Sequence, residues 1–324
     1  METEAAIAVL GATGNQGGHV ARVLRAAGLP VHALTRNPGS VAAQGLKAAG
    51  CTLIAADMED PASLLQALSG AAAVFSVQNV WDFGSEKEVR LGTTVIEAAR
   101  RAGVPHFVYA SGLGAERPRG LQALDGKAEL ERRLAASGIP FTILRPALFV
   151  DDFFGASIPF RGPVRRFAER HRPLVGRLFL AALEGFVASG ASIPVASLSD
   201  LARTAHWAFS HPPGSSGRIL PVVSTWTDLA ELRRLYTAAT GIRPPHVPFA
   251  GAGLSVVHPD MAALLRFLVS LEPDAVERPL VLPPLSEWFQ RFSVTAGIPD
   301  DYACSDALSE EAGRPEPSVQ RDPV

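Results

Sequence analysis

The feature that most constrains the fold is a glycine-rich turn between an apolar run and a helix-like segment near the N-terminus. The turn reads Gly11-Ala12-Thr13-Gly14-Asn15-Gln16-Gly17 and follows the apolar run Ala5–Leu10, which is typical of a strand buried on both faces. In a phosphate-binding turn, Gly11 would allow the chain to turn sharply as it leaves the strand. Gly14 would let the backbone approach a pyrophosphate, and Gly17 would let the helix pack closely on the sheet. The amides at the helix start would hold the anion. The alternative is a glycine-rich turn without a ligand.

The first 145 residues alternate between short apolar runs and amphipathic segments. This alternation predicts an α/β, doubly wound parallel-sheet Rossmann fold with helices on both faces. The predicted strands are Ala5–Leu10, Val31–Leu34, Cys51–Ala55, Ala72–Val77, His106–Ala110 and Pro140–Leu144. The predicted helices are Gly14–Gly28, Val41–Ala49, one that begins at Pro61 and ends before Gly70, Glu86–Ala102 and Lys127–Ala136.

After Arg145 the alternation loosens, which predicts a smaller mixed α/β C-terminal lobe. We expect helices at Val164–Arg170, Leu174–Glu184, Leu198–Ser210, Thr227–Thr240, Met261–Leu271 and Leu285–Phe292, and short strands at Ile193–Val195, Arg218–Val222 and His246–Phe249. The expected organisation is a dinucleotide-binding domain over residues 1–150 and a substrate lobe over 151–300, with sheet strands that the two can share. The polar, proline-rich residues 301–324 predict a disordered tail.

Charge and composition exclude several classes of protein. The net charge of −2 argues against a nucleic-acid binder. Two cysteines build neither a disulfide framework nor a zinc site, and no His, Asp or Glu spacing suggests another metal. The longest apolar stretch is interrupted by Arg177 and Glu184, so we expect no membrane span. These features, with an acidic N-terminus unlike a signal peptide, predict a soluble, cytoplasmic protein.

The end of the second predicted strand favours NADP(H) as the cofactor. An NAD site usually carries an acidic residue there. In this chain, residues 5–56 contain four basic residues but neither Asp nor Glu. We expect Arg36 to bind the 2′-phosphate; the alternative is an ordinary exposed arginine. Asp57 and Met58 are expected to border the adenine, with a polar loop as the alternative. Val77 and Gln78 would border the middle of the cofactor.

Several of these motifs together resemble the NmrA-like family of atypical short-chain dehydrogenases. The resemblance covers roughly residues 5–295 and rests on segments 10–18, 33–38, 57–60, 102–111, 127–129 and 141–149. It implies an NADP-binding Rossmann domain with a small substrate lobe. Family members divide between reductases of quinones, azo dyes or triphenylmethanes and redox sensors without turnover, so the resemblance leaves enzyme and sensor open.

The proton relay of ordinary short-chain dehydrogenases, Tyr-x-x-x-Lys, is missing from the sequence. Leu113, Thr240 and Asp306 stand four residues after the three tyrosines. The family's reductases place a lysine where this chain has Lys127, which implies a role in binding the nicotinamide ribose or in proton donation. The alternative is a surface lysine paired with Glu131. Ser111 is expected to line the site as a hydroxyl of its wall.

Hydride transfer needs a water-poor slot beside the nicotinamide. Candidates for its walls are aromatic residues and a proline, although each could equally belong to the core of the small lobe. They are Trp81, Phe83, Pro146, Phe149, Phe153 and Phe154. Pro146 and Phe149 are also expected to contact the cofactor. The sequence thus predicts an NADPH-dependent reductase of a quinone-like or conjugated small molecule, with two alternatives: a non-catalytic sensor acting through a protein partner, and a redox-neutral enzyme.

Overall fold

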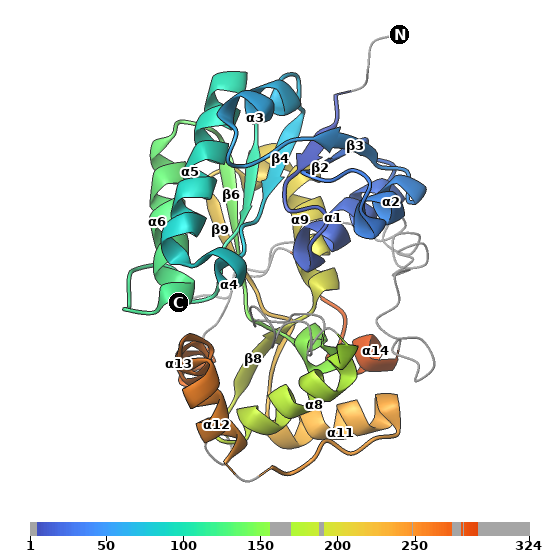
Figure 1. Ribbon diagram of the computed structural model, residues 1–324, viewed down its shortest axis with the longest axis vertical. Helices are drawn as coiled ribbons and strands as arrows, with labels where there is room; N and C mark the ends of the chain where they lie inside the picture. The colour runs from blue at the N-terminus through green and yellow to red at the C-terminus, as the bar shows by residue number, and fades with distance from the viewer. Residues whose placement is uncertain are drawn as a thin grey trace, which may run out of the picture.

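The chain folds into two lobes, each with its own sheet (Figure 1). This computed structural model describes residues 5–155, 170–187, 191–247, 249–273, 280 and 282–290. The helix expected over 164–170, apart from Arg170, and the tail expected over 301–324 lie outside the described residues.

The larger lobe is built on a seven-stranded sheet in which all neighbouring strands are parallel. The strand order is β3-β2-β1-β4-β5-β6-β9, so the direction of winding reverses between β1 and β4. The strands are β1 (Ile7–Val9), β2 (Val31–Thr35), β3 (Thr52–Ala55), β4 (Ala73–Ser76), β5 (Phe107–Ala110), β6 (Phe141–Pro146) and β9 (Arg218–Val222). This order confirms the predicted doubly wound fold and places a crevice for ligands beyond the carboxyl ends of β1 and β4.

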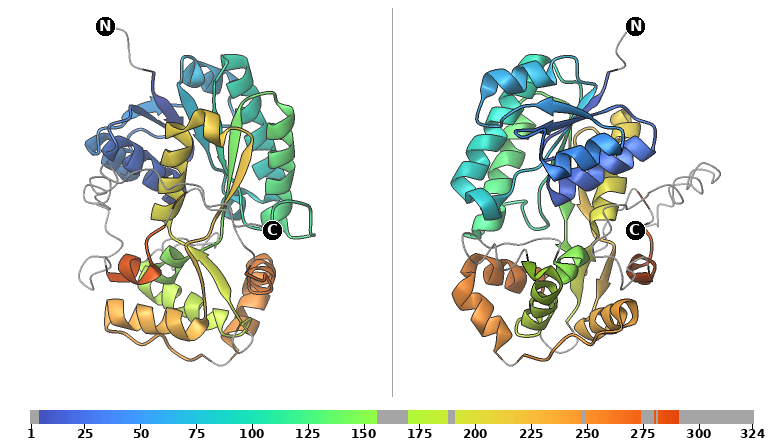
Figure 2. Two further views of the ribbon diagram at one scale, coloured as in Figure 1. Left: turned by 180° about the vertical axis from the view of Figure 1, so that it is seen from behind. Right: turned by 45° about the vertical axis from the view of Figure 1, so that its right-hand side comes forward.

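Helices cover both faces of this sheet (Figure 2). One face carries α1 (Asn15–Ala26), α2 (Val41–Ala48) and α9 (Leu198–Ser210), with the short α10 (Pro212–Ser215) following α9; the other carries α3 (Pro61–Leu68), α5 (Ser85–Ala102) and α6 (Gln122–Ala136). Leu24 of α1 and Leu201 of α9 share one buried cluster, and Leu64 and Leu130 belong to the opposite one. The apolar residues thus lie inward at the spacing that an amphipathic helix requires.

The smaller lobe packs helices around a three-stranded sheet of order β10-β8-β7. Its strands are β7 (Leu148–Phe149), β8 (Ile193–Ala196) and β10 (Thr225–Thr227), and its helices are η1 (Val150–Phe154), α8 (Arg172–Leu183), α11 (Leu229–Thr240), α12 (Ala250–Val257), α13 (Pro259–Leu268) and α14 (Leu285–Gln290). The core of this lobe includes Phe153, Leu232 and Leu265. Within the described ranges, no helix is both long enough and apolar enough to cross a membrane.

The chain returns from the small lobe to the large sheet before it ends. After β8, Ser197 and Asp200 form a capping box that starts α9, and Asp151 of η1 accepts a hydrogen bond from the Leu198 amide at 2.9 Å. β9 then pairs with β6, with Thr142 opposite Arg218. Residues 198–222 therefore complete the large lobe.

Some local expectations were wrong. The strand expected at His246–Phe249 does not form among the described residues: His246 and Val247 have no regular structure, and Phe249, with φ +65°, is the N-cap of the next helix. The helix α12 follows instead. Helix α6 begins at Gln122, before the expected Lys127, and the sequence did not predict α4 (Val80–Phe83), β7 or β10.

Candidate functional site

A cavity of about 680 Å³ lies along the carboxyl edge of the large sheet and reaches the small lobe. Its walls include the glycine turn after β1 and the segments that follow β2, β3, β4 and β5. Helix α13 of the small lobe contributes Met261, Leu264 and Leu268. The cavity therefore occupies the crevice that the strand order creates.

Two glycines of the turn, Gly11 and Gly17, have no room for a side chain. Gly11 has φ +66°, and a Cβ there would lie 2.7 Å from Cγ1 of Val77. A Cβ on Gly17 would lie 2.4 Å from the carbonyl oxygen of Gly11. Gly14 is the N-cap of helix α1, and no side chain caps this end of the helix. The amides of the first turn have no intrahelical acceptor. The residues of that turn line the cavity together with Thr13. This end of the cavity suits an anion.

Arg36 follows β2 and lines the cavity as an exposed residue. Glu59 is an acidic neighbour that the sequence pattern did not indicate; it also lines the cavity and forms an ion pair with Lys87 at the start of α5. The hydrogen bond from Lys87, together with the charges of Lys87, Arg90 and Arg36, lowers the pKa of the Glu59 carboxyl. Arg36, Lys87 and Arg90 therefore all lie close enough to Glu59 to act on its charge.

Asp57 and Met58 lie on the cavity wall after β3. Oδ1 of Asp57 accepts a hydrogen bond from the Glu59 amide at 3.0 Å, which is the turn-forming role expected of a polar loop. Met58 packs against the cluster that contains Leu64. Asp57 therefore stabilises the loop after β3 and also lies beside the cavity.

Two glutamine side chains that line the cavity each keep one oxygen without a partner. Oε1 of Gln78 and Oε1 of Gln16 are buried and accept no hydrogen bond, whereas Nε2 of Gln78 donates to Oγ of Ser76 at 2.7 Å. Buried polar atoms are rarely left unsatisfied. Both oxygens are therefore available to donors of a ligand in the cavity. Val77 lies on the same cavity wall.

Lys127 of α6 lines the cavity and pairs with Glu88 of α5, with 2.7 Å between Nζ and Oε1. The expected alternative partner, Glu131, is bound elsewhere. The Lys127 side chain is 13% exposed and that of Glu88 0% exposed. Burial raises the pKa of the Glu88 carboxyl, and the positive charge of Lys127 opposes that rise. Gly112 lies beside this pair, and a Cβ there would be 3.4 Å from Cδ of Lys127.

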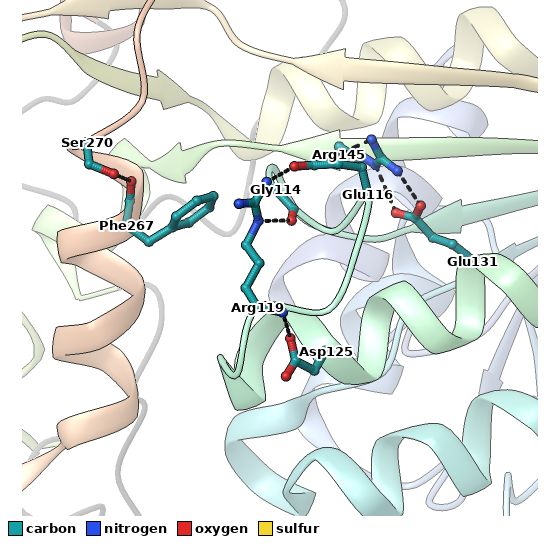
Figure 3. A network of polar contacts seen from close by, with 8 residues as sticks. All are labelled: Gly114, Glu116, Arg119, Asp125, Glu131, Arg145, Phe267 and Ser270. Carbon is teal, nitrogen blue, oxygen red and sulfur yellow. Dashed lines mark hydrogen bonds and ion pairs between the residues drawn. The ribbon is translucent and has the colours of Figure 1, made fainter.

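Ser111 follows β5 on the cavity wall, and Oγ donates to Oε1 of Glu131 at 2.5 Å. Arg145 of β6 holds the same carboxylate with two hydrogen bonds, from Nε at 3.0 Å and from Nη2 at 2.5 Å. Figure 3 shows Arg145 between Glu131 and Glu116, with Arg119 on the far side of Glu116. The Cζ atom of Arg119 lies 4.6 Å from the ring centre of Phe267 in α13, so this network reaches the small lobe.

Tyr109, two residues before Ser111, points into the layer of α5 and α6 rather than into the cavity. The residue is 3% exposed, and its hydroxyl has no hydrogen-bond partner. Burial, with the charges of Glu88 and Glu131, raises the pKa of this phenol well above its usual range. The tyrosine next to the cavity thus keeps its proton.

The apolar end of the cavity is more aliphatic than expected. Trp81, Pro146 and Phe149 line it, whereas Phe153 is fully buried in the core of the small lobe. The side chain of Phe83 lies outside what the structure describes. The aliphatic members of the wall are Leu113, Leu124, Leu148, Met261, Leu264 and Leu268. Those from α13 carried no sequence signal, since only the tertiary fold brings that helix to the cavity.

A model of the NmrA-like family matches residues 3–243. Among curated relatives, an NmrA-like family domain-containing oxidoreductase, FrzB, of Cladobotryum sp. is 31% identical over 75% of this chain and 75% of its own length. An NAD(P)H azoreductase of Xenophilus azovorans is 32% identical over 52% of this chain and 55% of its own.

Two solved structures are also similar. The triphenylmethane reductase of Citrobacter sp., complexed with NADP(H), has a TM-score of 0.66 and 23% identity, over 88% of this chain and 99% of that chain. An NADPH-dependent quinone oxidoreductase of Escherichia coli, complexed with NADPH, has a TM-score of 0.57 and 29% identity, over 81% and 86%.

Proposed function

The chain belongs to the NmrA-like family, and on that premise we propose that it is an NADPH-dependent reductase of a quinone-like or otherwise conjugated small molecule. The observation that carries this proposal is one continuous cavity, with an anion-binding turn at one end and an apolar chamber beside Lys127 at the other. The quinone oxidoreductase at 29% identity acts on that class of substrate and supports the choice.

The residues of the cavity fit NADP(H). The turn at Gly11, Gly14 and Gly17 presents helix amides to a pyrophosphate. The unpartnered oxygens of Gln16 and Gln78 suit hydroxyl or amide donors of a dinucleotide. The remaining proposed contacts are Thr13, Asn15, Arg36, Asp57, Met58, Val77, Lys127, Pro146 and Phe149.

Arg36 is the proposed reader of the 2′-phosphate. A guanidinium can donate two parallel hydrogen bonds to a phosphate, and Lys87 and Arg90 offset the negative charge of the nearby Glu59. The variant Arg36→Ala should therefore weaken NADPH by about 10- to 100-fold and NADH by less than about 3-fold. Calorimetric titration of both cofactors measures the difference, and equal losses for both would remove Arg36 from this role.

The chemistry that NADPH supplies when bound is transfer of a hydride from its nicotinamide ring. Trp81, Phe149 and the leucines of the wall exclude water from the acceptor. The carboxylate of Glu88 holds the Lys127 ammonium at the cavity wall, where Nζ can donate a proton to the oxygen of the reduced acceptor. Lys127 thus takes the role of proton donor without a Tyr-x-x-x-Lys relay.

Turnover tests the proposal directly. Purified protein is mixed with NADPH and a panel of quinones and enones, and the nicotinamide absorbance is followed. We expect oxidation of NADPH by at least one acceptor and a lower turnover rate for Lys127→Met. Tight NADPH binding without turnover across the panel, with a protein partner recovered by pull-down, would instead support a redox sensor.

A further inference from the structure

We infer that Ser111 is a hydrogen-bond acceptor for the bound ligand and cannot act as a donor, so the ligand presents an N–H or O–H group to it. A serine at the end of this strand would ordinarily be free to donate to a carbonyl. Here its single hydroxyl hydrogen is committed to Glu131. The inference rests on the proposed function only in taking this cavity as the ligand site.

The position of Ser111 is fixed by the sheet. Its amide donates to the carbonyl of Leu144 at 2.8 Å, which continues the pairing of β5 with β6 beyond Ala110. The residue is 3% exposed and lies on the cavity wall beside Gly112 and Lys127. Ser111 is therefore a polar residue of the cavity wall at the end of β5.

Glu131 accepts a hydrogen bond from Arg145 at each of its two carboxylate oxygens. The two side chains are 8% and 14% exposed, so solvent screens their attraction little. Arg145 is itself held by Glu116, with 3.7 Å between Nη1 and Oε2. A carboxylate bound in this way by a guanidinium only accepts hydrogen bonds.

The strength of the bond decides the direction in which the hydroxyl points. A hydrogen bond to a carboxylate is roughly twice as strong as one between neutral groups. A neutral carbonyl in the cavity therefore cannot draw the Ser111 hydrogen away from Glu131. The oxygen of Ser111 retains lone pairs that can accept from a ligand, while Lys127 provides the donor on the same wall.

The donor could be a hydroxyl of the reduced substrate or the amide of the nicotinamide, and paired ligands separate the two. The substrate pair is 1,4-dihydroxynaphthalene, kept anaerobic, and 1,4-dimethoxynaphthalene. The cofactor pair is NADP⁺ and its 3-acetylpyridine analogue, in which a methyl group replaces the amide nitrogen. Dissociation constants are measured by calorimetry for the wild type and Ser111→Ala, and for the substrate pair both with and without NADP⁺.

In one of the two pairs, the wild type should prefer the donor-bearing ligand by about 2- to 10-fold, the value of one neutral hydrogen bond. Ser111→Ala should abolish that preference and leave the affinity for the other member unchanged. The control is Thr142→Val, which removes a buried strand hydroxyl outside the cavity wall and should leave both ratios unchanged.

Glu131→Gln tests the positioning role of the carboxylate. The amide of this variant can donate to Ser111, which frees the hydroxyl to donate, so the preference should shift towards 1,4-naphthoquinone. If Arg145 cannot tolerate the change and the variant does not fold, the Ser111→Ala ratios still decide. If NADP⁺ binds and the affinity ratios of both ligand pairs are the same in Ser111→Ala as in the wild type, the inference is overturned. If NADP⁺ does not bind, the proposed function is refuted. The substrate pair measured without cofactor then tests the inference.

Discussion

Replacement of Lys127 by Met should destabilise the protein in a manner that depends on pH. Methionine keeps the length and packing of the side chain beside Gly112 but removes the charge that faces Glu88. The Glu88 carboxylate, 0% exposed, would then lack its counter-ion. Removal of one partner from a buried ion pair costs about 3–5 kcal/mol, which is the expected loss in free energy of unfolding at pH 8.

At lower pH the loss should shrink because Glu88 can take up a proton. Burial already raises the pKa of this carboxyl in the folded protein, and loss of the lysine would raise the pKa further. When the pKa of a carboxyl is higher in the folded protein than in the unfolded chain, its protonated form stabilises the fold. This contribution is complete below about pH 4 and is lost as the pH rises towards the pKa of the folded protein. Near pH 5 the variant should therefore lose only about 1 kcal/mol.

Urea denaturation at pH 5 and pH 8 measures both values. Glu88→Gln is the matched variant: it leaves a lysine that can reach the water of the cavity, and should cost about 1–2 kcal/mol at either pH. The double variant should be more stable at pH 8 than Lys127→Met alone, since no buried charge remains. A loss below about 1 kcal/mol for Lys127→Met, equal at both pH values, would refute this account of the pair.

Three further changes have defined outcomes. Gly17→Ala would place a Cβ 2.4 Å from the carbonyl oxygen of Gly11 and should lower the free energy of unfolding by about 1–3 kcal/mol; an unchanged melting temperature would show that the turn can open. Burial, with neighbouring carboxylates, raises the pKa of Asp151 to about 8, so the free energy of unfolding of the wild type should fall by at most about 5 kcal/mol between pH 4 and 8. Asp151→Asn should reduce this dependence of stability on pH, which melting curves at several pH values measure. Gly114→Ala combines φ +95° with a Cβ 2.2 Å from the Phe267 ring, so it should cost about 1–3 kcal/mol and increase hydrogen exchange in α13; protection equal to the wild type would contradict the contact.

The parts of the fold that depend on local pattern were predictable. The strand, turn and helix around Gly11 form one continuous segment, so the sequence alone indicated both the turn and its place at the edge of the sheet. Arg36, Asp57 and Gln78 follow three strands of one parallel sheet, and such a sheet brings these positions to the same edge.

The parts that depend on distant pairing were not predictable. Lys127 pairs with a carboxylate 39 positions earlier, whereas helical spacing suggested Glu131 as the alternative. Glu131 is instead taken by Arg145, which approaches from β6. The aromatic residue Phe153 could have lined the cavity or the core, and only the packing of the small lobe decides this.

The route of the chain between the lobes bears on how the protein could be divided by engineering or proteolysis. A fragment that ends near residue 150 would leave β6 with an unpaired row of backbone donors and acceptors, because β9 comes from residues 218–222. It would also uncover the apolar side of α1, which α9 otherwise shields. A bare strand edge beside exposed apolar surface promotes self-association, so such a fragment should aggregate, and the two lobes must be made as one polypeptide.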